Sequence, residues 1–355
     1  MIGQRLKLAR SASGLSLRDL ESAIGNLVTA QAIGKYERNE DMPSSGVLSA
    51  LARALNVSED YLIATDDMVL DGVEFRKKGI ASKKEEAFVE GRALHLLERY
   101  LTIEDALGLA SVVWDRPFEA PYPIKNMADA ESAARAIRMH WDLGIDPIQN
   151  LSELLEERGI KILSVDLSDI DGLTAKVKRK NGEPVPVIII KANTWAERKR
   201  FTLAHELGHM LMVARPGADA EKAANRFAGA FLMPAEALRR EIGNQRTTIS
   251  FGELAQLKEL FGASFQAITY RCRELGILNE AAFKRMFQAF NEQGWRKPPY
   301  EEPGAMEPNR EQPQRMERLT FRALAERVIG ESKAAEILGI SVRDLTQRMD
   351  QPVAA

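Results

Sequence analysis

The chain has 355 residues, and its hydrophobic fraction of 45% is ordinary for a globular protein with two or three domains. The formal net charge of −2 excludes nucleic-acid binding over the whole surface, so any such function requires a local face. The single cysteine, Cys272, excludes an internal disulfide, and its place in a helical pattern indicates a structural residue. The sequence shows no leader-like start and no apolar run near ~20 residues. We therefore expect a cytoplasmic protein that makes no membrane contact.

Residues 1–65 carry the pattern of a compact all-helical domain. Ser16 is a good N-cap, and Gly25 is a typical residue to end a helix. The predicted helices are one through Leu6–Ala9, then Leu17–Ile24, one from about Thr29 to Arg38, Val47–Leu55 and Glu59–Ile63. A helix, a short turn and a second helix form the geometry that places the second helix in the major groove of DNA.

This segment resembles the Xre/Cro-type helix-turn-helix, including the run Tyr36-Glu37-Arg38-Asn39. The resemblance implies that the chain binds a double-stranded DNA operator, and that Arg10 and Glu37 form a structural pair. Gln31 could read an adenine edge, whereas Lys35 would contact phosphate. The DNA-binding residues that the resemblance implies are Thr29, Ala30, Gln31, Lys35 and Arg38.

Two features depart from that motif, namely Glu21, where a small residue is usual, and the slightly long turn Gly25–Val28. Residues 1–65 hold seven basic and seven acidic residues, although residues 1–38 hold six against three. Because phosphate neutralisation dominates DNA affinity, one copy would bind weakly and we expect a homodimer. The alternative is a helical protein-interaction module that does not bind DNA.

Residues 66–125 are predicted to form a helical connector. Basic pairs at Lys77-Lys78 and Lys83-Lys84 precede a helical pattern over Glu85–Leu101, and a proline-rich crossover ends the segment. His95 in this helix and His140 beyond it could each serve an active site or be ordinary half-buried residues.

Residues 126–235 are predicted to form a small α+β domain. Helices are expected at Asp129–Trp141 and Leu151–Arg158, and strands at Lys161–Val165, Ala175–Lys178 and Val185–Ile190. Three short strands beside a long helix are typical of this fold class.

That long helix contains His-Glu-Leu-Gly-His at residues 205–209, inside an apolar run. The spacing places His205 and His209 on one helix face, where both can reach a Zn²⁺ at about 2.0–2.1 Å. Glu206 lies about 100° further round, from where it can reach a metal-bound water without ligating the metal. The pattern predicts a zinc hydrolase; two satisfied core histidines are the structural alternative.

A zinc hydrolase needs a third protein ligand and an open fourth position. We expect the motif helix to run to about Ala214 and the chain to turn at Pro216-Gly217. In the first turn of the next helix, Glu221 is the predicted third ligand and Asp219 is the second choice.

The run Arg200–His209, the pattern Glu221-x-x-Ala-Asn-Arg-Phe-Ala and Leu232-Met233-Pro234 together resemble the ImmA/IrrE family of bacterial metallopeptidases. The resemblance covers about residues 130–300. It implies that His205, His209 and Glu221 bind Zn²⁺ and that Glu206 is the general base. It also implies a protein substrate, for example a helix-turn-helix repressor in a stress or mobile-element response.

The remaining chain is predicted to be helical. Residues 236–300 form an extension with a helix-turn-helix-like pattern over 253–275, which plain packing also explains. Residues 301–318 are expected to be a linker. Residues 319–355 form a small helical domain, for DNA binding or for dimerisation.

The predicted fold class is therefore multi-domain and mainly α, with an N-terminal all-α helix-turn-helix domain, a central α+β zincin-like domain with a small sheet, and a C-terminal helical region. The leading hypothesis is a zinc endopeptidase fused to a DNA-binding module, acting on a repressor or on another copy of the chain. The alternatives are a regulator that uses the zincin fold as sensor or scaffold, and the antitoxin of a toxin–antitoxin pair. Mn²⁺ or Fe²⁺ could replace Zn²⁺ at two imidazoles and a carboxylate.

Overall fold

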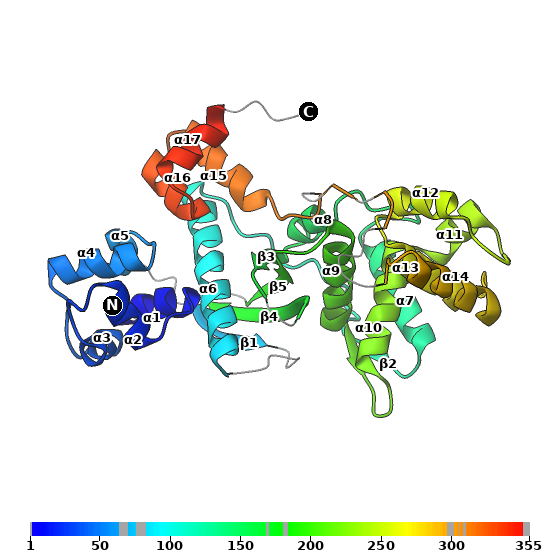
Figure 1. Ribbon diagram of the computed structural model, residues 1–355, viewed down its shortest axis with the longest axis horizontal. Helices are drawn as coiled ribbons and strands as arrows, with labels where there is room; N and C mark the ends of the chain where they lie inside the picture. The colour runs from blue at the N-terminus through cyan, green and yellow to red at the C-terminus, as the bar shows by residue number, and fades with distance from the viewer. Residues whose placement is uncertain are drawn as a thin grey trace.

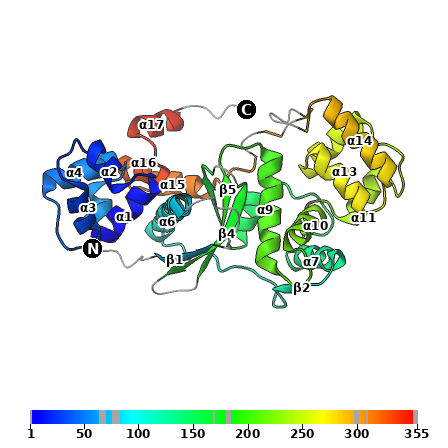
Figure 2. The same ribbon diagram turned by 60° about the horizontal axis from the view of Figure 1, so that its bottom comes forward.

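The computed structural model describes residues 2–63, 70–75, 83–167, 170–179, 184–296, 302–304, 306–307 and 310–350. Within these residues, the N-terminal and the C-terminal helices both lie against one long helix, α6 (Lys83–Ala106), as Figure 1 shows. A small sheet lies between α6 and the motif helix α9 (Ala196–Leu211) (Figure 2). The predicted basic pair Lys77-Lys78 lies outside the described residues.

Five short helices form the N-terminal unit around a core that includes Leu6, Leu20 and Leu51. They are α1 (Ile2–Ala12), α2 (Leu17–Ala23), α3 (Ala30–Glu37), α4 (Ser45–Ala54) and α5 (Glu59–Ile63). Ser16 and Thr29 cap α2 and α3 by accepting backbone N–H groups, which confirms the predicted helix starts. The predicted pair is also present: Arg10 Nε lies 2.6 Å from Glu37 Oε1 and ties α1 to α3.

Helix α1 packs closely against α6. A Cβ added at Gly91 of α6 would lie 2.7 Å from the backbone of α1, so only glycine permits this approach. Arg5 Nη1 lies 2.7 Å from Glu98 Oε1 across the same interface. His95 stands edge-on to the Tyr61 ring there, and burial lowers its pKa to about 3. His95 is therefore a neutral interface residue and lies outside the predicted zinc site.

The sheet contains β1 (Leu70–Phe75), β3 (Lys161–Val165), β4 (Gly172–Arg179) and β5 (Val185–Lys191), in the order β1-β4-β5-β3. Strand β4 is antiparallel to both neighbours, and β3 pairs in parallel with β5. The three predicted strands are present, while β1 was not predicted. One face of the sheet packs on α6 through Leu97 and Leu173, and the other packs on α9 through Ile188 and Leu203.

The motif helix ends earlier than predicted. Helix α9 stops at Leu211, and Met212–Ala214 forms strand β6, which pairs in parallel with β2 (Tyr122–Ile124). The expectation of helix to Ala214 is wrong because Met212 adopts an extended conformation (φ −123°, ψ 152°), so that the chain meets β2. The strand pair satisfies backbone groups there, and no local sequence signal marks it.

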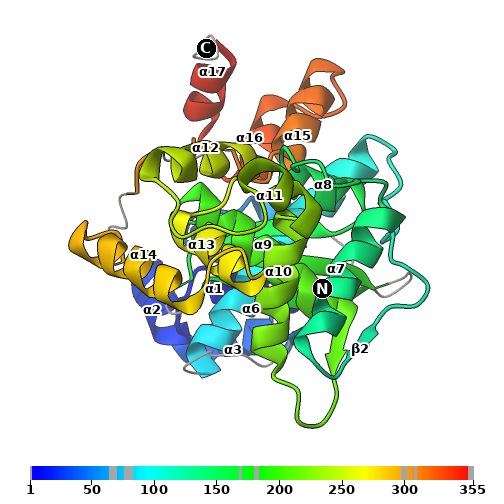
Figure 3. The same ribbon diagram turned by 90° about the vertical axis from the view of Figure 1, so that its right-hand side faces the viewer.

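The other helices of this region share one hydrophobic core with α9, and Figure 3 shows them from the side away from the N-terminal unit. They are α7 (Met127–His140), α8 (Leu151–Glu157), α10 (Ala220–Leu232), α11 (Ala235–Ile242), α12 (Phe251–Phe261), α13 (Phe265–Glu274) and α14 (Glu280–Glu292). In the part of the chain that the structure describes, no helix has the length and apolar character needed to cross a membrane.

The described part of the expected linker, residues 301–318, packs against the rest of the protein. Glu311 is fully buried, its Oε1 lies 2.5 Å from Arg200 Nη1, and its Oε2 accepts the backbone N–H groups of Leu151 and Ser152. A buried guanidinium is stable only with a carboxylate beside it, and the ion pair between Arg200 and Glu311 therefore fixes the segment around Glu311 against α9. The chain continues into α15 (Arg315–Ala325), α16 (Glu331–Leu338) and α17 (Val342–Asp350).

The variant Glu311→Ala is expected to lower the free energy of unfolding by about 3–5 kcal/mol, because it leaves Arg200 buried without its carboxylate. Denaturant titration measures this change. The matched control is Arg322→Ala, which breaks a half-exposed pair with Glu326 and should cost less than ~1 kcal/mol. Equal effects of both variants would contradict the assignment.

Candidate metal centre

Helices α9 and α10 approach each other closely because small residues lie between them. A Cβ at Gly208 of α9 would lie 2.9 Å from the Phe227 ring of α10, and Ala224 and Ala228 of α10 are fully buried. This packing places the first turn of α10 beside the face of α9 that carries the two motif histidines.

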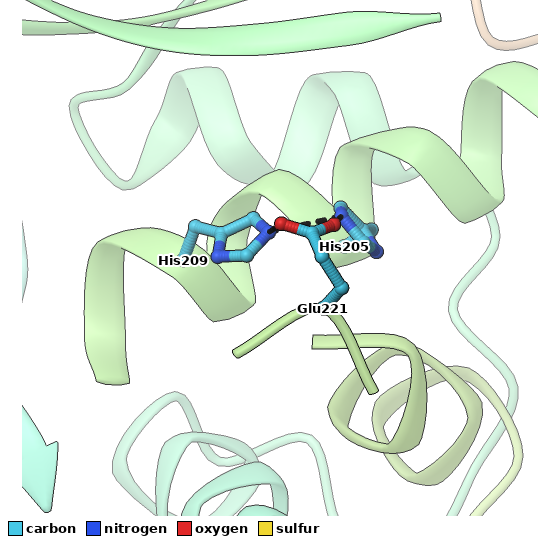
Figure 4. A group of neighbouring side chains, drawn as sticks. All are labelled: His205, His209 and Glu221. Carbon is cyan, nitrogen blue, oxygen red and sulfur yellow. Dashed lines mark hydrogen bonds and ion pairs between the residues drawn. The ribbon is translucent and has the colours of Figure 1, made fainter. Parts of the chain in front are cut away.

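Three predicted ligands meet at this crossing (Figure 4). His205 Nε2 lies 3.4 Å from Glu221 Oε2, and His209 Nε2 lies 3.6 Å from Glu221 Oε1. The two Nε2 atoms are 3.0 Å apart. Among the described residues, His205, His209 and Glu221 form a group whose ligand atoms all lie within 4.8 Å of one another.

These separations fit a tetrahedral metal ion. Bonds of about 2.0–2.1 Å at tetrahedral angles place neighbouring donor atoms roughly 3.3 Å apart. The observed 3.0–3.6 Å between donor atoms agrees with that value. Two imidazoles and one carboxylate are also a usual donor set for zinc, and manganese or iron accept the same set.

Asn225 contacts one of the candidate ligands, a partner that the sequence analysis missed. Its Oδ1 lies 2.9 Å from His205 Nδ1. An N–H at Nδ1 that donates to this oxygen leaves the lone pair on Nε2, the atom that faces Glu221. The spacing could have shown this, because Asn225 follows Glu221 by four residues and so shares its helix face.

Asp219, the second choice for the third ligand, lies outside the group. Its Oδ1 accepts the backbone N–H groups of Glu221 and Lys222 at the start of α10, and Lys222 Nζ lies 3.2 Å from Oδ2. The hydrogen bond from the Lys222 backbone N–H lowers the pKa of Asp219, and the hydrogen bond from the Lys222 ammonium lowers it further. Its carboxylate therefore acts as a helix cap.

Glu206 is buried on the side of α9 that faces the sheet. A Cβ added at Gly172, the first residue of β4, would lie 3.5 Å from Glu206 Cγ. The side chain of the predicted general base therefore lies between α9 and the start of β4. Glu206 directly follows His205 in the sequence.

Two other sequence candidates lie outside the metal cluster. His140 Nε2 lies 2.7 Å from Asp115 Oδ1, in a partly exposed cluster that includes Arg158. Burial raises the pKa of the Cys272 thiol to about 12, which agrees with its interpretation as a structural residue.

The candidate DNA-contacting residues lie along α3. Gln31, Lys35 and Arg38 are exposed, Thr29 caps the helix, and Ala30 is partly buried. Arg38 forms two hydrogen bonds with Glu40, at 2.7 and 2.8 Å. Glu21, the departure from the motif, accepts the backbone N–H of Ala30 at 3.1 Å and so supports the start of α3.

Comparisons with known proteins identify the same two units. Residues 6–62 match the helix-turn-helix family model, and residues 155–273 match the peptidase M78 model, described as the IrrE N-terminal-like domain. A relative is the SPbeta prophage-derived uncharacterized HTH-type transcriptional regulator YonR of Bacillus subtilis (strain 168), with 36% identity over 63 residues. The match covers 18% of this chain and 56% of that relative. The chain therefore combines a helix-turn-helix-like segment with a segment similar to the IrrE N-terminal-like domain.

Removal of the Glu221 carboxylate should weaken zinc binding by more than ~100-fold, because a ligand is lost and not merely a hydrogen-bond partner of a ligand. Competition with a chromogenic chelator measures the affinity of Glu221→Ala. Asp219→Ala is the matched control, and it should retain zinc while it loses a helix cap. Equal zinc content in Glu221→Ala and the parent protein would remove Glu221 from the site.

Proposed function

We propose that this chain is a zinc-dependent endopeptidase whose activity is joined to DNA binding, and that its substrate is a helix-turn-helix repressor or another copy of itself. The observation that carries the proposal is the convergence of His205, His209 and Glu221, with Glu206 next to His205. The match to an IrrE-like peptidase domain supports the same reaction class.

In this proposal His205, His209 and Glu221 hold the ion through two nitrogens and one carboxylate. Zinc held there would polarise the substrate carbonyl and lower the pKa of a bound water toward ~7. Glu206 accepts a proton from the attacking water, whose oxygen bonds to the carbonyl carbon. The C–N bond breaks, and Glu206 returns the proton to the leaving amine.

The burial of the site favours this chemistry. Glu206 is 4% exposed and His209 is 5% exposed, so bulk water does not screen the charges that they face. The Glu221 carboxylate is about half exposed, at 55%, and leaves one side of the cluster accessible. Asn225 holds His205 in the tautomer that a metal ligand needs.

For the regulatory half, we propose that α3 enters the major groove of an operator and that two copies bind together. The exposed side chains of Gln31 and Lys35 support this placement. The similarity to a prophage-derived regulator supports a role in a mobile-element or stress response.

Glu206→Gln should keep zinc and lower the rate of peptide-bond cleavage by at least ~10²–10⁴-fold, because the amide cannot accept the proton of the water. The measurement combines zinc analysis with mass spectrometry of repressors from the genomic neighbourhood and of the chain itself. Glu236→Gln, an exposed glutamate of α11, is the matched control.

If Glu206→Gln processed such a substrate as fast as the parent protein, the endopeptidase proposal would fail. A parent protein that regulates through DNA and cleaves neither class of substrate would favour the regulator with a non-proteolytic zincin fold. Neutralisation of a neighbouring toxin would favour the antitoxin.

Gln31→Ala should cost ~1–3 kcal/mol of binding to an operator selected from random duplexes, and should relax preference at one base pair. Lys35→Ala should instead weaken binding to all sequences and reduce the slope of log K against log salt by ~1. Fluorescence anisotropy at several salt concentrations separates these results. Equal sequence dependence in both variants would exclude base reading by Gln31.

A further inference from the structure

We propose that Gly172, the first residue of β4, is a positioning residue for the general base. Its lack of a side chain lets the stem of Glu206 lie directly against the β4 backbone, and this contact fixes where the Glu206 carboxylate lies. The inference rests on the proposed peptidase function and deepens it. Gly172 acts through Glu206 and is not itself a metal ligand.

The face of the sheet that meets α9 has large side chains next to a position without one. Ile188 and Ile190 of β5 belong to the hydrophobic core that includes α9 residues, whereas Leu173 of β4 belongs to the core on the α6 side. Because side chains alternate along a strand, Gly172 faces α9. It lies opposite Ile190 in the ladder. Helix α9 can therefore approach the β4 backbone closely at this point.

Two residues of α9 occupy the space that a side chain at position 172 would need. A Cβ there would overlap Thr202 Cγ2 and would lie 3.5 Å from Glu206 Cγ. Thr202 and Glu206 are four residues apart and so share one face of α9. Both are buried, with 6% and 4% exposure. A larger residue at position 172 would therefore force a shift of α9 or of these two side chains.

Glycine is needed here for space and not for backbone conformation, because Gly172 is not among the glycines with a positive φ. The strand itself is held in place. Gly172 pairs with Ile190, and the Lys191 N–H donates to Asp171 O at 2.8 Å. An added methyl group would thus act on the turn of α9 that carries Glu206 rather than on the strand.

The position of the Glu206 carboxylate matters because proton transfer requires close approach. A general base must come within about 2.6–3.2 Å of the atom whose proton it accepts. A misplacement of about 1 Å can cost about 10²-fold in rate. A side-chain stem packed against a rigid strand limits such misplacement.

The test uses the full-length, zinc-loaded protein with acetohydroxamic acid as the probe. The two oxygens of a hydroxamate can chelate zinc, and a carboxylate beside the metal can accept its N–O–H proton. The affinity of this probe therefore reports the position of the Glu206 carboxylate without a known substrate. Isothermal titration calorimetry measures the affinity, and competition with a chromogenic chelator measures zinc binding by each variant.

Gly172→Ala should lower the affinity for acetohydroxamic acid about tenfold and change zinc affinity by less than about threefold, because the base moves while the three ligands stay. Adding Thr202→Ser removes the overlapping methyl group and should restore the affinity to within about threefold of the parent. The matched control is Gly252→Ala in α12, where the nearest atom to the added Cβ is 4.0 Å away. It should bind like the parent.

A double-mutant cycle determines whether the effect acts through Glu206. Glu206→Ala should itself lower the affinity about tenfold or more. In that background Gly172→Ala should cause no further loss, because the carboxylate that it misplaces is already absent. General distortion of the metal site would instead lower the affinity in both backgrounds.

The proposal would be overturned, while the hydrolase site stands, by three results: parent-like binding by Gly172→Ala, an equal loss in both backgrounds, or no recovery with Thr202→Ser. If Gly172→Ala does not fold, the Gly172→Ala/Thr202→Ser variant decides. Affinity within about threefold of the parent supports the proposal, and a tenfold loss contradicts it. If the zinc-loaded parent does not bind acetohydroxamic acid at all, the proposed hydrolase site fails, and this inference fails with it.

Discussion

The candidate metal site depends on the close packing of α9 on α10, because its three side chains come from both helices. Gly208 and Ala224 permit the approach, and a larger side chain at either position would separate Glu221 from the two histidines. Two buried ion pairs also fix the start of α9: Arg200 pairs with Glu311, and Glu197 pairs with Lys258 of α12. Donor atoms that lie 3.0–3.6 Å apart need a rigid frame of this kind.

Helix α6 connects the IrrE-like domain to the helix-turn-helix domain. Helix α6 packs on the sheet with one face, receives α1 in another region, and contacts α15 near its C-terminal end. The buried pair Arg5–Glu98 crosses the contact between α1 and α6. The sheet and the helix-turn-helix domain therefore both pack on α6 (Figure 2). This helix supports the parts of the chain to which the two proposed activities belong.

Glutamates in this chain occupy three distinct environments that their residue type alone does not distinguish. Glu221 faces two imidazoles, Glu206 lies buried beside the first residue of β4, and Glu311 neutralises a buried guanidinium. Glu21 adds a fourth, since it accepts a backbone N–H at the start of α3. The environment of each carboxylate, and not its residue type, therefore decides what it can do.

The sequence by itself determined the features that depend on neighbours within about four residues along the chain. The shared face of His205 and His209 follows from the helical repeat, and the ends of α2 and α3 follow from Ser16, Gly25 and Thr29. Only the tertiary structure decided the long-range features: the distances from Glu221 to the two histidines, the pairing of β1 with β4, the early end of α9 and the burial of Glu311. These depend on which segments meet after folding, and residue spacing along one helix or strand carries no information about that meeting.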